Sequence, residues 1–265
     1  METEVRKCKN CQSVLHGPYC SVCGQKWIDE RLTVKRVLSS AISNIFNLEK
    51  GLWYTVKMLF ISPGQVVRDY VNGRTQPYFP PFRYALIFIA LAAFANLGLG
   101  VYDSQMDQII DQCKKIGMYS TPEDEAQGRE IMKFMTNFLN FIPFLLLPFL
   151  SLSSYVLFKR EKWYYAEHMA LNTFLLGHVS LLGIFNTLLV YFVPAVLPFF
   201  FFLSTAIYIL VYGLCYRQLF KRNLFEGFFL GFFTYLLAFV FFFLTVGVLS
   251  FVLGFAVAMI MKSFD

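Results

Sequence analysis

The fold of this chain is decided by an apolar stretch, FFLGFFTYLLAFVFFFLTVGVLSFVLGFAVAMIM, which covers residues 228–261. As a single α-helix this stretch would be about 51 Å long, whereas the hydrocarbon core of a bilayer is about 30 Å thick. It is too long for one helix that crosses the bilayer upright, and slightly too short for two crossing helices joined by a turn. We expect one long tilted or broken helix here, with two helices as the alternative.

Four further apolar runs precede this stretch, and each is long enough to cross a bilayer as a helix. They cover Phe82–Tyr102, Thr136–Phe158, His168–Val193 and Phe199–Tyr216. Hydrophobic residues make up 57% of the 265 residues and charged residues only 15%, against about one quarter charged in a soluble domain. This composition excludes an ordinary water-soluble enzyme. We predict an all-α polytopic membrane protein with about five transmembrane helices, or six if the last run divides.

The distribution of charge predicts which way the spans point. Basic residues predominate before Tyr84, whereas acidic residues outnumber basic ones in the connection 103–135. Lys and Arg in short loops are retained on the cytoplasmic side of a membrane. We therefore expect a cytoplasmic N-terminus and an extracytoplasmic loop at 103–135. The basic connections 159–162 and 217–222 then also fall on the cytoplasmic side, as alternation requires.

Four cysteines form two pairs, Cys8-x-x-Cys11 and Cys20-x-x-Cys23. This is the spacing of a miniature zinc ribbon, because a two-residue spacer lets one tight turn present two sulfurs to a tetrahedral Zn²⁺. Gly24 supplies the permissive backbone that such a turn needs. Two disulfides are the alternative, but they require an oxidising compartment, and the charge distribution places this segment in the reducing cytoplasm. We expect a structural Zn²⁺, since four thiolates leave no open coordination position.

The chain divides into three predicted parts: a ribbon at 1–28, a juxtamembrane linker at 29–80 and a membrane domain at 81–265. Apolar residues recur at spacings of three and four within 34–46, which predicts an amphipathic helix with Thr33 as its N-cap. Basic residues around the cysteines are few and form no stripe, so nucleic-acid binding is not expected.

Five short motifs follow one another between residues 8 and 84. They are Cys-x-x-Cys, Tyr-Cys-x-x-Cys-Gly-Gln, Pro-Gly, Tyr-x-x-Gly-Arg and Tyr-x-x-Pro-Phe-Arg-Tyr. This order resembles a bacterial family of uncharacterised multi-span membrane proteins with an N-terminal zinc ribbon, known as a domain of unknown function. The resemblance implies that the four cysteines bind zinc and that the protein lies in a bacterial inner membrane, and it implies no activity. The juxtamembrane motif of the family corresponds to Pro63, Gly64, Tyr70, Gly73, Arg74, Tyr78, Pro81, Arg83 and Tyr84.

Two arginines and three tyrosines of this motif lie close to the predicted first span. We consider Arg74, Arg83, Tyr70, Tyr78 and Tyr84 as contacts for lipid headgroups or an anion, because guanidinium groups match phosphate oxygens. Ordinary anchoring at the membrane interface by Arg and Tyr is the simpler alternative.

The predicted third span carries a polar stripe. On a helical wheel His168, Asn172 and Asn186 fall at about 0°, 40° and 0°, and His178 at about 280°. Such a stripe should face the interior of the protein, where it would line a solute path or form hydrogen bonds between helices.

These features favour a non-enzymatic membrane protein, because the sequence contains no nucleophile–base motif or phosphate loop. Our first hypothesis is a docking or assembly protein that binds a cytoplasmic protein through its ribbon. The alternative is a transporter of small solutes or lipids, or a lipid-handling protein, that uses the polar stripe. Membrane lipids are expected partners, and a homo-oligomer is left open.

Overall fold

A computed structural model describes residues 6–27, 33–34, 51–119, 121–139 and 142–262. The described helices, in chain order, are α2 (Leu52–Ile61), α3 (Pro63–Val71), α4 (Pro81–Gly98), α5 (Val101–Lys115), α6 (Pro122–Leu139), α7 (Ile142–Leu157), η1 (Lys159–Glu161), α8 (Tyr165–Phe192), η2 (Pro194–Phe199), α9 (Phe200–Leu219) and α10 (Leu224–Lys262). Strand pairing in these residues is limited to two isolated bridges, so the all-α prediction is confirmed. The predicted amphipathic helix at 34–46 lies almost entirely outside the described residues.

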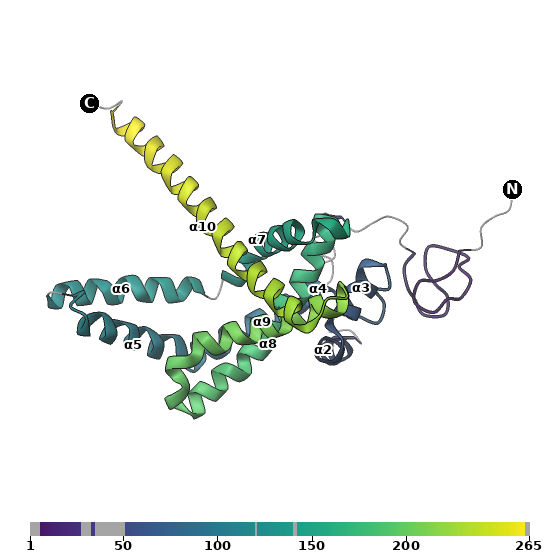
Figure 1. The fold of residues 1–265 in the computed structure, drawn as a ribbon, viewed down its shortest axis with the longest axis horizontal. Helices are drawn as coiled ribbons and strands as arrows, with labels where there is room; N and C mark the ends of the chain where they lie inside the picture. Colours follow the sequence, from purple (N-terminus) through teal and green to yellow (C-terminus); the bar gives the residue numbers. More distant parts are fainter. Residues whose placement is uncertain (1–5, 28–32, 35–50, 120, 140–141, 263–265) are drawn as a thin grey trace.

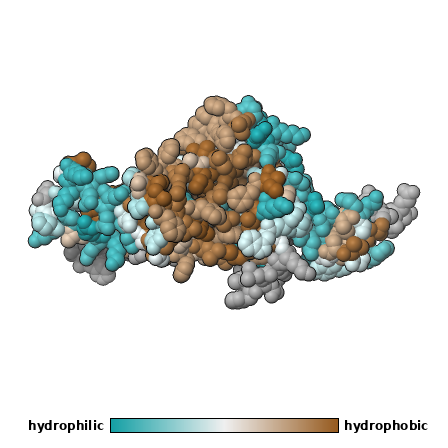
Figure 2. Space-filling model, turned by 90° about the horizontal axis from the view of Figure 1, so that it is seen from below, coloured by the Kyte–Doolittle hydropathy of each residue, from teal (hydrophilic) through white to brown (hydrophobic). Residues whose placement is uncertain are grey.

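Four helices are long and apolar enough to cross a membrane. They are Pro81–Gly98, Tyr165–Phe192, Pro194–Leu219 and Leu224–Phe255. Figure 2 shows a broad apolar band across the middle of the molecule, with hydrophilic surface toward both ends. The chain is therefore a membrane protein by the length and composition of its helices.

Two predicted spans have different ends in the structure. The first span was expected to reach Tyr102, but α4 ends at Gly98 because Gly100 adopts a left-handed conformation (φ 61°) that breaks the helix. The second span was expected at 136–158. Instead α6 ends at Leu139, and the apolar α7 is 16 residues long, shorter than the four spans above.

The last apolar run is one continuous helix, α10, which passes through Gly247 and Gly254 without a break. Its C-terminal part projects away from the other helices (Figure 1), whereas its first part packs against α9 and α7. Within Leu224–Phe255, only 6% of the most apolar 18-residue segment is buried.

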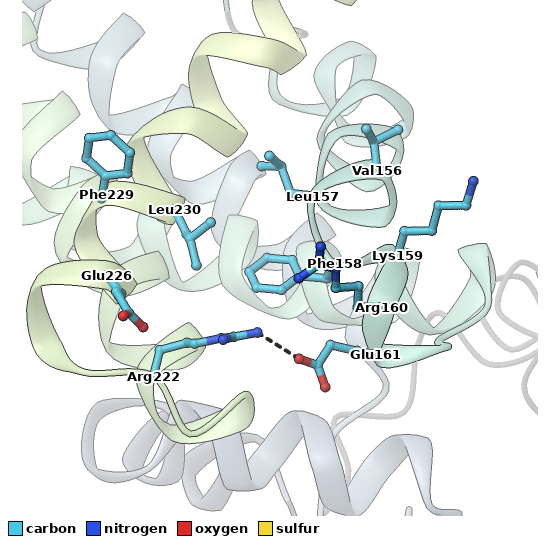
Figure 3. Close-up of a pocket in the computed structure, with 10 residues that line it drawn as sticks. All are labelled: Val156, Leu157, Phe158, Lys159, Arg160, Glu161, Arg222, Glu226, Phe229 and Leu230. Carbon is cyan, nitrogen blue, oxygen red and sulfur yellow. Dashed lines mark hydrogen bonds and ion pairs between the residues drawn. The ribbon is translucent and has the colours of Figure 1, made fainter.

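An ion pair lies at the beginning of α10. Just before this helix, Arg222 pairs with Glu161 of η1 at 3.0 Å (Figure 3).

Glycines allow the helices of the bundle to touch. A Cβ atom on Gly177 of α8 would lie 2.8 Å from Cα of Ala85 in α4. A Cβ atom on Gly227 of α10 would lie 2.5 Å from the carbonyl oxygen of Gly213 in α9. Small residues at such crossings are typical of helix packing in membranes, where close van der Waals contact replaces the hydrophobic driving force.

A juxtamembrane layer formed by α2 and α3 packs against this bundle. Gly64 lets α3 approach α9, since its Cβ atom would lie 2.7 Å from the amide nitrogen of Leu219. Arg68 donates hydrogen bonds of 2.7 Å to the carbonyl oxygens of Gln218 and Leu219 at the end of α9. A cation at a helix C-terminus satisfies carbonyls that have no partner in the helix. This layer therefore has a fixed position on the bundle.

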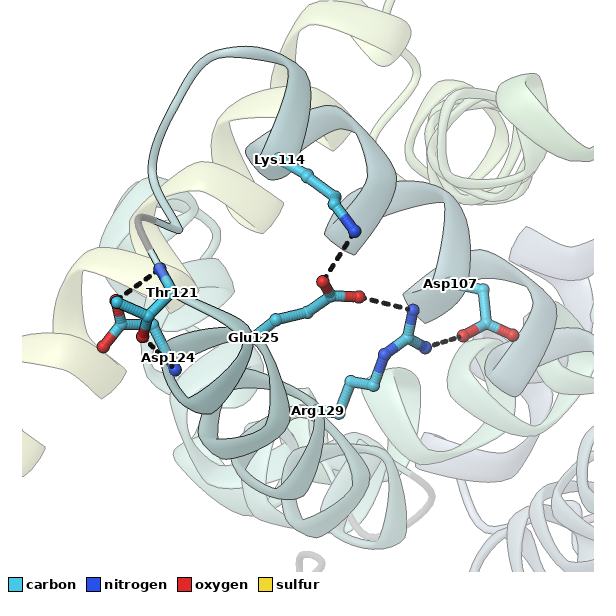
Figure 4. A network of polar contacts seen from close by, with 6 residues as sticks. All are labelled: Asp107, Lys114, Thr121, Asp124, Glu125 and Arg129. Carbon is cyan, nitrogen blue, oxygen red and sulfur yellow. Dashed lines mark hydrogen bonds and ion pairs between the residues drawn. The ribbon is translucent and has the colours of Figure 1, made fainter.

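The connection 103–135 forms a helical hairpin of α5 and α6 rather than an open loop (Figure 1). Figure 4 shows Glu125 between Lys114, at 2.7 Å, and Arg129, at 3.2 Å, and Arg129 also pairs with Asp107 at 2.6 Å. The hydrogen bond from Lys114 is the main cause that lowers the pKa of Glu125 below its usual value, and the hydrogen bond from Arg129 adds to it. The ion pairs of Lys114 with Glu125 and of Arg129 with Asp107 join the two helices of the hairpin.

Candidate metal centre and its juxtamembrane contacts

The two cysteine pairs form two turns with the same backbone pattern. In the first, the amide of Gln12 donates to the carbonyl of Cys8 at 2.9 Å, and in the second Gly24 donates to Cys20 at 2.9 Å. The fifth residue of each turn is left-handed, with φ 63° at Gln12 and 72° at Gly24. The sequence predicted this role for Gly24 and missed it for Gln12, because glutamine carries no signal for a left-handed backbone.

The four sulfurs converge on one point between the turns. Sγ of Cys8 lies 3.5 Å from Sγ of Cys23, and Sγ of Cys11 lies 3.5 Å from Sγ of Cys20. All four lie within 4.8 Å of one another. Thiolates in a tetrahedron around zinc would be about 3.8 Å apart, whereas a disulfide has a sulfur–sulfur distance of about 2.05 Å. The cysteines are free thiols, and their arrangement could hold a metal ion.

The hydroxyl of Ser13 lies between two of these sulfurs. Its oxygen is 2.9 Å from Sγ of Cys11 and 3.0 Å from Sγ of Cys20. This contact lowers the pKa of Cys11 and is the main cause that lowers the pKa of Cys20 to about 6. Burial raises the pKa of Cys23 to about 11. A thiolate is the form of cysteine that binds metals, and the single proton of the Ser13 hydroxyl can stabilise one of these two thiolates at a time. Sequence reasoning did not identify Ser13.

Gln25, which follows the second cysteine pair, joins the ribbon to the turn after α3. Its side-chain nitrogen donates to the carbonyl of Gly73 at 3.1 Å and to the hydroxyl of Thr75 at 3.0 Å. Its side-chain oxygen accepts from the amide of Gln76 at 2.8 Å. The side chain is 3% exposed. The Cys-Gly-Gln motif and the Gly-Arg motif, 48 residues further along, are therefore in direct contact.

Arg74 takes part in the same interface. Its guanidinium donates to the side-chain oxygen of Asn10 in the first turn of the ribbon at 3.1 Å, and pairs with Asp69 at 3.3 Å. Tyr78 donates a hydrogen bond of 2.8 Å to the same carboxylate of Asp69. Two of the predicted headgroup contacts thus have protein partners, and a role in headgroup binding stays a prediction for them.

The other three predicted headgroup residues are buried. Tyr70 packs edge-on against Phe174 with ring centroids 5.3 Å apart, and burial raises its pKa to about 12. Arg83 is 6% exposed. The hydroxyl of Tyr84 lies 3.1 Å from Nδ1 of His178. Tyr70 thus joins the juxtamembrane layer to α8, and Tyr84 joins α4 to α8.

The first half of the polar stripe contacts α7. Nδ1 of His168 lies 3.1 Å from the hydroxyl of Ser154. Asn172 donates to the same hydroxyl at 2.8 Å and to the carbonyl of His168 at 2.8 Å. The stripe therefore hydrogen-bonds α8 to α7 at this level.

The second half contacts α4 and α9. His178 meets Tyr84 of α4, and Asn186 donates to the carbonyl of Phe200 at 3.2 Å and to the hydroxyl of Ser204 at 2.8 Å. The four stripe residues are buried, as the helical wheel predicted. Neither the groove of Figure 3 nor the pocket inside the α5–α6 hairpin, the two described here, is lined by a stripe residue. The contacts of the polar stripe are therefore hydrogen bonds that join α8 to its neighbouring helices.

Replacement of Gln25 by alanine should release the ribbon from the turn without removing its metal ligands. The buried carbonyl of Gly73 would lose its partner, which costs about 1–3 kcal/mol, and the amide of Gln76 would become free to exchange with solvent. We expect hydrogen exchange at the Gln76 amide to accelerate by about tenfold or more, with metal content unchanged. Gln65→Ala, on an exposed position of α3, is the control. Unchanged exchange in Gln25→Ala would show that the contact does not hold the ribbon.

Comparison with known proteins matches one segment of this chain to a family. Residues 49–94 match a family described as "Protein of unknown function (DUF3667)". The match covers α2, α3 and most of α4, and it includes the turn after α3 that contacts the ribbon. No curated protein and no solved structure matches the chain. The match supports the resemblance for the juxtamembrane motif, and assigns no activity.

Proposed function

We propose that this chain is a multi-pass protein of a bacterial inner membrane that docks a cytoplasmic protein through a zinc-bound ribbon. Four converging thiols are a donor set suited to tetrahedral Zn²⁺. Cys8, Cys11, Cys20 and Cys23 would hold the ion, which would have a structural role because no coordination position stays open. Zinc would fold a segment that is too small to form a core of its own.

The observation that carries this proposal is the asymmetry of the ribbon. Gln25 and Asn10 attach one side of it to the juxtamembrane turn. Elsewhere the ribbon exposes three apolar side chains, Val14 at 44%, Tyr19 at 58% and Val22 at 73%. Exposed apolar side chains on a small, fixed module favour a protein-binding role. We call these three residues the ribbon patch.

The placement of charge supports a cytoplasmic ribbon. The acidic α5–α6 hairpin follows α4, and the basic residues Lys159 and Arg160 follow α7. If α7 crosses the membrane, it returns the chain to the side of the ribbon, as the positive-inside rule requires. A helix of 16 residues is about 24 Å long, so this crossing would need local thinning of the bilayer or flanking residues to complete it.

Photo-crosslinking tests the docking role. A photoreactive amino acid at position 22 should yield one discrete adduct with another protein in native cells, because Val22 is the most exposed member of the ribbon patch. Replacement of Tyr19 by serine should reduce this adduct several-fold through loss of apolar contact, with zinc content unchanged. The control carries the photoreactive group at Met118, which is 63% exposed beside the α5–α6 hairpin. Absence of an adduct at position 22, or the same adduct at 118, would refute docking through the ribbon patch.

A further inference from the structure

A groove opens between the end of α7 and the beginning of α10. Its volume is about 560 Å³, within the range of about 300–1,000 Å³ that is usual for ligand sites. Leu157, Phe158 and Leu230 form apolar walls, and Phe229 lies at the side. Figure 3 shows these side chains above a charged row at the lower edge of the groove. The groove therefore has one apolar and one charged part.

The charged part contains one ion pair, two charges without partners that border the groove, and Lys159, whose ammonium points away from the groove in Figure 3. Arg222 and Glu161 neutralise each other at 3.0 Å. Arg160 and Glu226, which come from η1 and α10, form no ion pair or side-chain hydrogen bond within the described residues. Both side chains are exposed, and in Figure 3 they lie on opposite sides of the groove. A ligand that complements them must carry a negative group and a positive group next to an apolar part.

We infer that this groove binds a phospholipid whose headgroup carries a phosphate and a primary ammonium, the chemistry of phosphatidylethanolamine. The phosphate would contact the guanidinium of Arg160, which matches phosphate oxygens. The ammonium would contact the carboxylate of Glu226. The acyl chains would lie against Leu157, Phe229 and Leu230. Basic pockets between transmembrane helices bind anionic headgroups, and the added carboxylate of Glu226 selects against a headgroup that is only anionic.

Surrounding surface supports a lipid rather than a soluble ligand. Val156 beside the groove is 48% exposed, and Phe229 is 54% exposed. Further along α10, Phe232 and Leu236 are exposed at 42% and 46%. An apolar surface thus continues from the groove along α10, in the direction that acyl chains would follow. The inference concerns lipid binding at this groove and does not depend on the ribbon or its partner.

Native mass spectrometry of the full-length protein in detergent tests the inference. The wild type should retain phosphatidylethanolamine about tenfold more tightly than phosphatidylglycerol, because only the former has an ammonium for Glu226. Glu226→Lys should reverse this preference. Arg160→Gln should weaken both lipids by about tenfold, because both carry the phosphate. Expected controls without effect are Glu123→Lys, which changes an exposed acid in the first turn of α6, and Arg6→Gln on the ribbon.

Two results would overturn the inference. One is an unchanged ratio of the two lipids in Glu226→Lys, provided that the variant elutes from size exclusion as the wild type does. The other is binding of water-soluble glycerophosphoethanolamine as tight as that of the lipid, since the acyl chains would then contribute nothing. If Glu226→Lys does not fold, the Arg160→Gln variant and the soluble headgroup still decide the question. Equal binding of all three lipids, phosphatidylcholine included, would likewise contradict recognition by Glu226.

Discussion

The double variant Cys8→Ser/Cys20→Ser should contain no zinc, and its ribbon should be unfolded while the membrane helices stay inserted. The variant removes one sulfur from each turn, and these two cysteines are only 1% and 3% exposed. Structural zinc contributes about 10–16 kcal/mol of folding free energy in small zinc-finger peptides. Within residues 6–27 no other interaction is of that size, since the backbone there is paired only at the two turns and at two isolated bridges.

Elemental analysis and limited proteolysis measure this effect together. Wild-type protein should contain about one zinc per chain and resist cleavage within residues 6–27, and the double variant should contain none and be cleaved there. Cys113→Ser is the matched control, because Cys113 is a free cysteine of the α5–α6 hairpin far along the chain from the ribbon. Wild-type protein without zinc, or a double variant that keeps it, would remove the metal from the proposal.

The two halves of the four-cysteine cluster were predictable because each is local. Each pair of cysteines sits in a turn whose hydrogen bond spans four residues, as from Gln12 to Cys8, so spacing alone brings the two sulfurs of a pair together. The contact of Gln25 with Gly73 was not predictable in this way. It joins residues 48 positions apart, and no periodicity or spacing encodes which two motifs of a chain will meet.

For the membrane helices, too, features that depend on neighbouring residues were predictable and contacts between distant residues were not. Apolar composition predicted about five spans, and four described helices are long and apolar enough to cross a membrane. Such runs form helices in lipid because a helix pairs its own backbone N–H and C=O groups. Their ends were less certain, since a single left-handed residue, Gly100, shortens the first span. On α8 the helical period predicted which residues share the buried face. It did not predict their partners, such as Ser154 for His168, which come from other helices.

Gly177→Val tests whether α4 and α8 pack closely against each other where they cross. A Cβ atom at this position would lie 2.7 Å from a ring carbon of Tyr84 and 2.8 Å from Cα of Ala85. Backbone atoms cannot move aside as a flexible side chain can, so the two helices must separate. Overpacking of this kind costs about 3 kcal/mol, which lowers the thermal midpoint by about 6–12 °C in a chain of this size. Separation would also break the contact between Tyr84 and His178.

Gly183→Val on the same helix separates this packing effect from that of helix propensity. A Cβ atom at Gly183 would meet nothing within 4 Å, and valine is a slightly better helix former than glycine. We therefore expect an unchanged or slightly raised midpoint for Gly183→Val, measured in the same detergent by scanning fluorimetry. Equal midpoints for the two variants would mean that α4 and α8 do not touch at Gly177. The placement of the stripe between the helices would then be wrong, because His178 lies one residue further along α8.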